Sequence, residues 1–137
     1  TLERSADNTI KIRPAGGFLI PPRQKTPGDP EQLPPIHPAH LLKMQTHGYR
    51  VPDKNPLNLG DVIELEGVRI EVTAMTDDNR PAEATFTFEK SLDDPTMRWI
   101  YWDHRDRMTA TTTNLFAFKK FTPPAVGETV VVPGPFY

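Results

Sequence analysis

The chain has 137 residues, with 16 Lys and Arg against 18 Asp and Glu, a formal net charge of −2 and no cysteine. A chain of this length forms one domain that can bury its own core, and the lack of cysteine excludes disulfides and thiolate metal sites. The near-neutral balance, without a block of like charge, argues against nucleic acid as a partner. No apolar run reaches the roughly 18 residues of a membrane span.

Two features of the whole chain favour an all-β fold. Sixteen residues are proline, about twice the average share. No segment keeps apolar residues at the helical spacing of i, i+3, i+4 and i+7 for three turns. We therefore expect a small antiparallel barrel or sandwich with an extended proline-rich arm.

Residues 1–20 are expected to form an N-terminal hairpin that joins the body of the domain. Alternating side chains lie on either side of the turn-forming pair Asp7-Asn8, namely Leu2, Arg4, Ile10 and Ile12. Alternation on both sides of such a pair is typical of two antiparallel strands. Since the sequence opens directly on this pattern, we expect the chain to be part of a longer protein.

Residues 21–56 contain too much proline for a helix or a central strand, because proline lacks a backbone donor and keeps the preceding residue extended. We expect a polyproline-like arm or insertion with at most one short helix, at residues 39–45. Two alternatives stay open for this arm: a linker that lies over the body, and a segment that binds a partner. In the second case the candidate interface residues are Pro34, Pro35 and Tyr49.

Three histidines of the arm are candidate metal ligands, since imidazole is the commonest metal ligand in proteins. They are His37, His40 and His47. Their spacing matches no zinc motif and His37 lies among prolines, so we expect exposed polar side chains on a loop. The sequence therefore predicts no metal and no other cofactor.

Residues 57–137 are expected to form the body. The stretch "GDVIELEGVRIEVTAM", residues 60–75, alternates on both sides of Glu66-Gly67 and predicts a hairpin. Residues 82–89 add a third strand after the turn cluster "TDDNRP". Further strands are expected at residues 97–103, 115–121 and 128–132, which makes six to eight short strands in all. The side chains expected to face the core are Ile63, Leu65, Val68, Ile70, Val72, Ala84, Phe86 and Phe88, and those expected to face outward include Glu83, Thr85, Thr87 and Glu89.

The strand expected at residues 97–103 carries the strongest functional signal. The stretch "RWIYWDHRDR" begins with Arg98, Trp99, Tyr101 and Trp102, and these residue types dominate the hot spots of protein interfaces. Two other interpretations stay open. The aromatic residues are core side chains with polar tips, or they stack on a base or a sugar.

Catalytic patterns are absent from the sequence. The carboxylate pairs Asp77-Asp78 and Asp93-Asp94 fall in predicted turns. Both serines of the chain are also expected in turns, and His104 lies in a charged loop, so nothing assembles a nucleophile with its base. These patterns favour a protein that is not an enzyme, and hydrolysis stays open as the alternative.

Three stretches together resemble the C-terminal soluble β-domain of an uncharacterised family of bacterial membrane-associated proteins. They are "TIKIRPAGGFL", "LGDVIELEGVRIEVTAMTDDNRPAEATFTFEKSLDDPTMRWIYW" and "FKKFTPPAVGETVVV". In that family a hydrophobic region precedes a β-domain with a "GD" hairpin, a "DGRPA" turn, a "LEDPSLRWL" strand and a closing "PPAVGE" turn. The present chain departs from this pattern by its arm and by an insertion after Trp102.

The resemblance implies an all-β domain joined to a membrane-anchored region that is not in this chain. The family has no assigned activity, so it carries over no catalytic residues. The expected function is a non-catalytic interaction or structural domain of a larger, membrane-associated bacterial protein or complex, with protein subunits as partners. The alternative is a domain that binds a small molecule or glycan, with or without hydrolysis, through the Trp99–Trp102 strand.

Overall fold

A computed structural model describes residues 1–19, 56–102 and 118–132. These residues contain no helix, which confirms the all-β prediction. The eight strands are β1 (Leu2–Ala6), β2 (Thr9–Ile12), β3 (Val62–Leu65), β4 (Val68–Met75), β5 (Pro81–Phe88), β6 (Ile100–Trp102), β7 (Phe118–Lys120) and β8 (Thr129–Val130).

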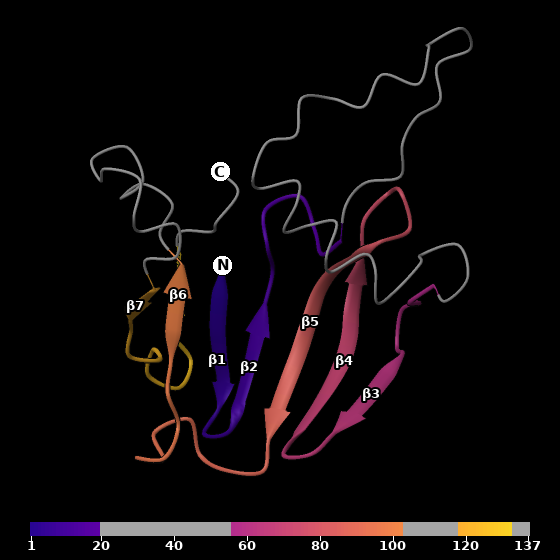
Figure 1. The fold of residues 1–137 in the computed structure, drawn as a ribbon. Coiled ribbons are helices and arrows are strands. Elements are labelled where there is room, and N and C mark those ends of the chain that lie inside the picture. The colour runs from indigo at the N-terminus through magenta and orange to yellow at the C-terminus, as the bar shows by residue number, and fades with distance from the viewer. Residues whose placement is uncertain (20–55, 103–117, 133–137) are drawn as a thin grey trace, which may run out of the picture.

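Six of these strands form one antiparallel sheet in the order β3-β4-β5-β2-β1-β8. Figure 1 shows β3, β4, β5, β2 and β1 side by side. Strands β6 and β7 form a separate two-stranded ribbon. The larger sheet is open, with β3 at one edge and β8 at the other, so the closed barrel expected as one possibility is not formed. The predicted arm and its short helix lie outside the described residues.

The register of the sheet places apolar side chains on one face. Ile63 is opposite Ile70, Ile70 is opposite Phe86, and Phe86 is opposite Ile10, so one apolar row crosses four strands. Because side chains alternate along a strand, the flanking residues belong to the same face. We call this the apolar face, and it consists of Leu2, Ile10, Ile12, Ile63, Leu65, Val68, Ile70, Val72, Ala84, Phe86 and Phe88.

The opposite side of the sheet, the polar face, carries charged residues and threonines. Glu64 is opposite Arg69, and Glu3 is opposite Lys11, so opposite charges meet across neighbouring strands. This alternation confirms the strand faces expected for Thr85 and Thr87, but Glu83 differs. Its side chain is buried although it lies on the outward side, because Arg13 and Thr73 pack over its carboxylate with distances of 2.8 and 2.9 Å.

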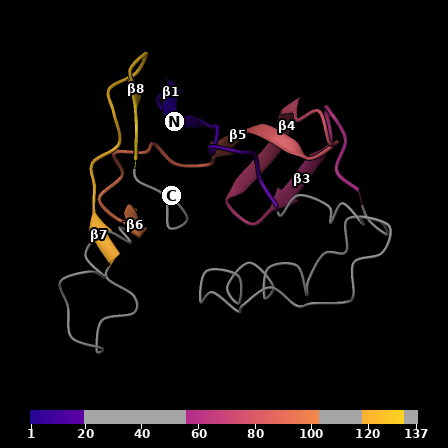
Figure 2. The same cartoon turned by 90° about the horizontal axis from the view of Figure 1, so that it is seen from above.

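The core lies where the ribbon packs on the sheet. Leu2, Ile10 and Leu92 are buried together, and Trp99 and Phe121 from the ends of the ribbon pack against them. Figure 2 shows β6 and β7 standing off the sheet next to β8 and β1. The ribbon therefore covers the β1–β2 side of the apolar face.

Two turns agree with the sequence analysis, and several strand limits differ. Gly67 has a φ of 78° in the two-residue turn between β3 and β4, and Asn79 has a φ of 59° in the "TDDNRP" turn. Strand β6 begins at Ile100 and not at Met97, β7 ends at Lys120, and β8 is limited to Thr129–Val130, while the predicted residues 103 and 115–117 lie outside the described residues. Ser5 lies in strand β1 and not in a turn.

Candidate interaction surfaces

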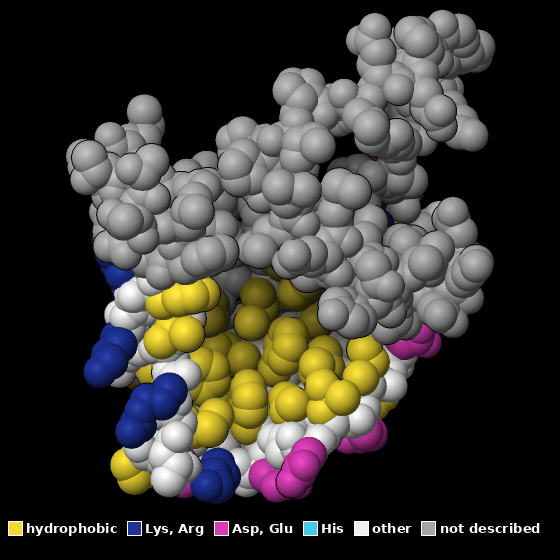
Figure 3. Space-filling view, viewed as in Figure 1, with side chains coloured by type: hydrophobic (Ala, Val, Ile, Leu, Met, Phe, Trp, Pro, Cys, Tyr) yellow, Lys and Arg dark blue, Asp and Glu magenta, His cyan; other side chains and the backbone are white. Residues whose placement is uncertain are grey.

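Among the residues that the structure describes, side chains cover the apolar face near β1 and β2 but leave it open near β3. Leu2 and Ile10 are buried beneath Leu92 and the ribbon. Towards β3, by contrast, Ile63, Val68 and Ile70 are only half-buried, and Leu65 is 57 % exposed. Figure 3 shows this as a continuous apolar surface between the ribbon and the acidic side chains at the opposite border.

The β3 segment adds exposed apolar side chains at the edge of the sheet. Leu59 is 64 % exposed and Val62 is 43 % exposed, in addition to Leu65. Three of the seven large hydrophobic residues that the described chain exposes therefore gather within seven positions. We call the segment from residue 59 to residue 65, together with Val68 and Ile70, the β3 surface.

The ribbon has an inner and an outer side. Trp99 packs edge-to-face against Phe88 and Phe121, with ring centroids 5.5 and 6.2 Å apart, and Tyr101 contacts Phe121 in the same way. These contacts support the interpretation of Trp99 and Tyr101 as aromatic side chains that pack at the border of the core. On the other side of the ribbon, Ile100 and Phe118 are exposed.

An open hollow of about 540 Å³ lies next to the ribbon. Its walls combine apolar side chains with both signs of charge, which come from Asp93, Asp94, Arg98 and Lys120. The indole N–H of Trp99 does not point to a ligand here, because it donates to the carbonyl oxygen of Leu92 at 2.8 Å. The lining residues are Leu92, Asp93, Asp94, Pro95, Met97, Arg98, Trp99, Ile100, Lys120, Phe121, Thr122 and Pro123.

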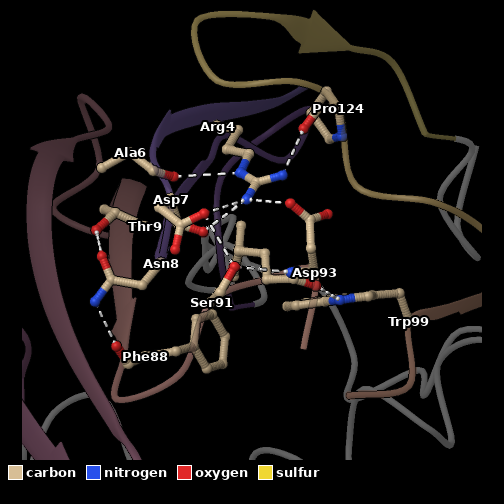
Figure 4. Close-up of polar contacts among 11 residues, drawn as sticks. Arg4, Ala6, Asp7, Asn8, Thr9, Phe88, Ser91, Asp93, Trp99 and Pro124 are labelled. Carbon is tan, nitrogen blue, oxygen red and sulfur yellow. Dashed lines mark hydrogen bonds and ion pairs between the residues drawn. The ribbon is translucent and has the colours of Figure 1, made fainter. Parts of the chain in front are cut away.

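A buried guanidinium holds the loop that carries Trp99. Arg4 is only 3 % exposed, and Figure 4 shows its side chain surrounded by oxygen atoms. It donates to the carboxylates of Asp93 at 2.8 Å and Asp7 at 3.0 Å, and to the Asp7 carbonyl at 2.8 Å. The carbonyls of Ala6 and Pro124 each accept a further bond at 3.3 Å. A buried charge is tolerated when it is paired and hydrogen-bonded in this way.

This Arg4 network connects three distant segments and perturbs its carboxylates. Asp7 also accepts hydrogen bonds from the Ser91 hydroxyl and the Leu92 amide, both at 3.0 Å, so the loop before Trp99 is fixed to the β1–β2 turn. The hydrogen bond from Arg4 lowers the pKa of Asp93, and the hydrogen bond to Asp93 raises the pKa of Arg4. Asp94 has a lowered pKa because the Thr96 hydroxyl and amide both donate to it.

A second buried arginine holds the chain where it leaves the sheet after β2. Arg80 is ion-paired with Asp78 at 2.9 Å and donates to the carbonyls of Gly16 at 2.8 Å and Leu19 at 3.0 Å. The hydrogen bonds from Arg80 and Thr76 lower the pKa of Asp78. One member of each predicted turn pair, Asp78 and Asp93, therefore neutralises a buried arginine.

The predicted interface residues have different outcomes. Arg98 and Trp99 line the hollow, whereas Tyr101 lies in the ribbon and is not among the residues that line it. Trp102 belongs to β6, opposite Phe118 in the register. Pro34, Pro35 and Tyr49 lie outside the described residues, as do His37, His40, His47 and His104.

Sequence reasoning did not assign two features that matter here. It treated Leu65 and Ile63 as core residues, whereas the described chain leaves them at an uncovered surface. It also gave no role to Arg4 or Arg80. For Arg4 a signal was available in the sequence. The alternation from Leu2 to the turn places this cation on the inward side of the strand, where a buried charge needs partners.

Two further kinds of feature are absent from residues 1–19, 56–102 and 118–132. These residues hold no group of three His, Asp or Glu side chains arranged to bind a metal ion. They also hold no helix with the length and apolar character needed to cross a lipid bilayer.

No protein-family model matches this chain, and neither a curated protein nor a solved structure is significantly similar to it. The resemblance to the bacterial membrane-associated family therefore stays an expectation from the sequence, and function is argued from the surfaces themselves.

Proposed function

We propose that this chain is a non-catalytic interaction domain of a larger protein or complex, and that it binds a protein partner through the β3 surface. The observation that carries the proposal is the exposure of Leu65 on the half-buried part of the apolar face, with Leu59 exposed just before the strand. Val62 is also exposed, but it lies on the polar side of β3, opposite Glu71 in the register. Contiguous apolar surface of this kind is typical of interaction sites. Its burial contributes about 25 cal/mol for each Å² removed from water.

A non-catalytic role is supported by the way the charged groups are used. Asp93 and Asp78 each neutralise a buried arginine, and Glu83 is paired with Arg13. Burial alone would raise the pKa of Glu83, but hydrogen bonds from Thr73 and Arg13 leave this pKa below its ordinary value. These carboxylates have structural partners and lowered pKa values, whereas a general acid or base needs a pKa near the working pH.

Membrane association is a separate part of the proposal. It is supported only by the three sequence stretches that resemble the bacterial family, in which a hydrophobic region precedes the β-domain. On this proposal the chain is an accessory domain, and its contact with the membrane comes through a part of the protein that is not in this chain.

The test is gentle detergent extraction of the native parent protein followed by size analysis. We expect the native protein to migrate in an assembly larger than itself. Leu65→Lys should reduce the migrating size to that of the single protein, because it places a charge on the apolar side of the β3 surface. Thr85→Lys is the matched control, since it adds the same charge to the polar face opposite Glu71.

Two results would contradict the proposed function. The first is a native protein that migrates alone at all concentrations. The second is a Leu65→Lys variant that stays in the full assembly although its circular dichroism matches that of the native chain.

A small-molecule site is the second candidate, and the hollow beside the ribbon favours it. Its volume of about 540 Å³ falls within the range of ligand pockets. The hydrogen bond of the Trp99 indole to Leu92 leaves the ring as an apolar surface without a free donor. Titration with oligosaccharides, followed by the NMR signal of the Trp99 indole N–H, tests this candidate, and an unchanged signal at millimolar sugar would remove it.

A further inference from the structure

Strand β3 is an edge strand whose outer side is not paired by any strand in the described chain. Its two-residue turn decides which backbone groups point outward. Leu65 and Val68 close this turn, so Leu65 and Ile63 exchange hydrogen bonds with β4. The alternate residues, Val62 and Glu64, therefore direct their N–H and C=O groups away from the sheet.

The β3 edge lacks the features that usually block strand addition. It contains no proline and no lysine, and its pairing with β4 has no register shift. Its one charged side chain, Glu64, is drawn towards β4 by Arg69, with a distance of 3.2 Å between Oε1 and Nε. The β8 edge, in contrast, has only two residues, and β7 carries Lys119 and Lys120.

The charges around β3 indicate what kind of segment fits. The described residues 56–75 contain four acidic side chains and one basic side chain, Arg69, and Figure 3 shows acidic groups at this border of the apolar face. A second copy of this chain would bring like charges together, and such pairs across strands are destabilising. A basic segment would meet complementary charge. The four acidic residues are Asp61, Glu64, Glu66 and Glu71.

We infer that the β3 edge receives an extended segment of a partner protein, which adds to the sheet as a further antiparallel or parallel strand. Its apolar side chains lie next to Ile63 and Leu65 on the apolar face, and its Lys or Arg side chains lie next to Glu64 on the polar face. Main-chain hydrogen bonds to Val62 and Glu64 supply affinity, and the alternating side chains supply selectivity. This inference rests on the proposed function, because it names the partner segment of the same surface.

The direct test uses the whole 137-residue chain labelled with ¹⁵N and a soluble peptide that alternates valine and lysine. We expect chemical-shift changes confined to β3 and its neighbours, and slower hydrogen exchange at the Val62 and Glu64 amides. A peptide that alternates valine and glutamate should bind at least about tenfold more weakly at low ionic strength, and added salt should reduce this difference.

A pair of substitutions isolates the backbone contribution. Val62→Pro and Val62→Ala both remove the branched valine side chain, but only proline removes the outward N–H, and an edge position tolerates proline. We expect Val62→Ala to retain most of the binding and Val62→Pro to lose it. Equal binding by the two variants, or protection that appears at β8, would overturn strand addition.

Charge reversal gives a second measurement that does not depend on the proline variant. Glu64→Lys should exchange the preference, so that the valine–glutamate peptide binds more tightly than the valine–lysine peptide. An unchanged preference would contradict the proposed chemistry of the segment.

The native assembly separates failure of this inference from failure of the proposed function. If Leu65→Lys disrupts the assembly while Val62→Pro leaves it intact, the interaction domain stands and strand addition is wrong. If neither variant affects the assembly, both ideas are wrong.

Discussion

Arg4 shows how one buried side chain positions a surface. Its guanidinium is bound by oxygens from the β1–β2 turn, the loop after β5 and the segment before β8. The Trp99 indole is in turn held by Leu92, whose amide bonds to Asp7. The orientation of the ribbon therefore depends on a cation that touches none of its strands.

The ion pair between Arg4 and Asp93 predicts a specific pH dependence. Because the hydrogen bond from Arg4 lowers the pKa of Asp93 in the folded state, the carboxylate contributes stability above the unfolded pKa of about 4. This contribution is lost as the pH falls through the lower folded pKa. Asp93→Asn should be less stable than the native chain at pH 7, and the difference should shrink progressively below about pH 4. Urea denaturation at a series of pH values measures it.

Two controls accompany this measurement. Glu66→Gln, at the exposed β3–β4 turn, removes one carboxylate without touching Arg4. Arg4→Met removes the cation, and in that background Asp93→Asn should have little further effect at any pH. A constant difference between Asp93→Asn and the native chain from pH 7 to pH 2 would contradict the assignment.

At the scale of elements, two turn glycines with the same backbone conformation have different surroundings. Gly67 has a φ of 78° and a Cβ at this position would contact nothing within 4 Å. Gly17 has a φ of 80°, but a Cβ there would lie 2.8 Å from the Thr76 side chain and 3.1 Å from the Pro81 carbonyl oxygen. The turn after β2 is thus packed tightly on the start of β5, whereas at Gly67 the carbonyl is engaged by the Glu89 amide and the space a Cβ would fill is open.

Alanine substitution at the two glycines should separate backbone strain from crowding. Gly67→Ala should cost about 1–2 kcal/mol of folding free energy, the penalty for a left-handed residue with a Cβ. Gly17→Ala should cost more, because the Pro81 backbone must also move. Gly67→Asn, which tolerates this conformation, is the control and should cost less than Gly67→Ala. Thermal and urea denaturation check the order, and an equal cost at both glycines would be inconsistent with these contacts.

At the scale of the whole molecule, local patterns predicted the strands and their hairpins well. Alternation around Glu66-Gly67 and Asp7-Asn8 is enough to specify two hairpins, because each depends on neighbours in sequence. The inward side of Ile10 and Phe86 followed from the same rule. Closure of the sheet was not predictable in this way, since it depends on which distant strands meet at its edges.

The buried charges and the uncovered surface needed tertiary information. Alternation placed Arg4 inward, but no local signal shows that Asp93, 89 residues later, meets it. In the same way, Ile10 and Leu65 carry equivalent patterns, and only the position of the ribbon makes one a core residue and the other an exposed one. The sequence therefore identified the apolar residues of the candidate site, but it did not show that they are exposed.

Truncation of apolar residues should reveal how unevenly the core is distributed. Ile10→Ala should cost about 2–5 kcal/mol, because it leaves a cavity beneath Leu92 and the ribbon. Leu65→Ala should cost less than about 1 kcal/mol, because most of this side chain is already in water. Urea denaturation compares the two, and an equal loss would mean that the β3 surface is covered within the isolated chain.

The pairing of β1 with β8 has a consequence for the order of assembly. Leu2 lies opposite Val130, and the backbone of Arg4 bonds to Gly127 and Glu128. The meander β3–β4–β5 closes through short turns and can form as soon as it is synthesised, whereas joining these two distant segments must overcome the entropy of a long loop. During synthesis on the ribosome, β1 therefore has no partner on its β8 side until the segment around residue 130 emerges. During that interval β1 is held by its hairpin partner β2, which pairs with β5, and by the ion pair of Arg4 with Asp93.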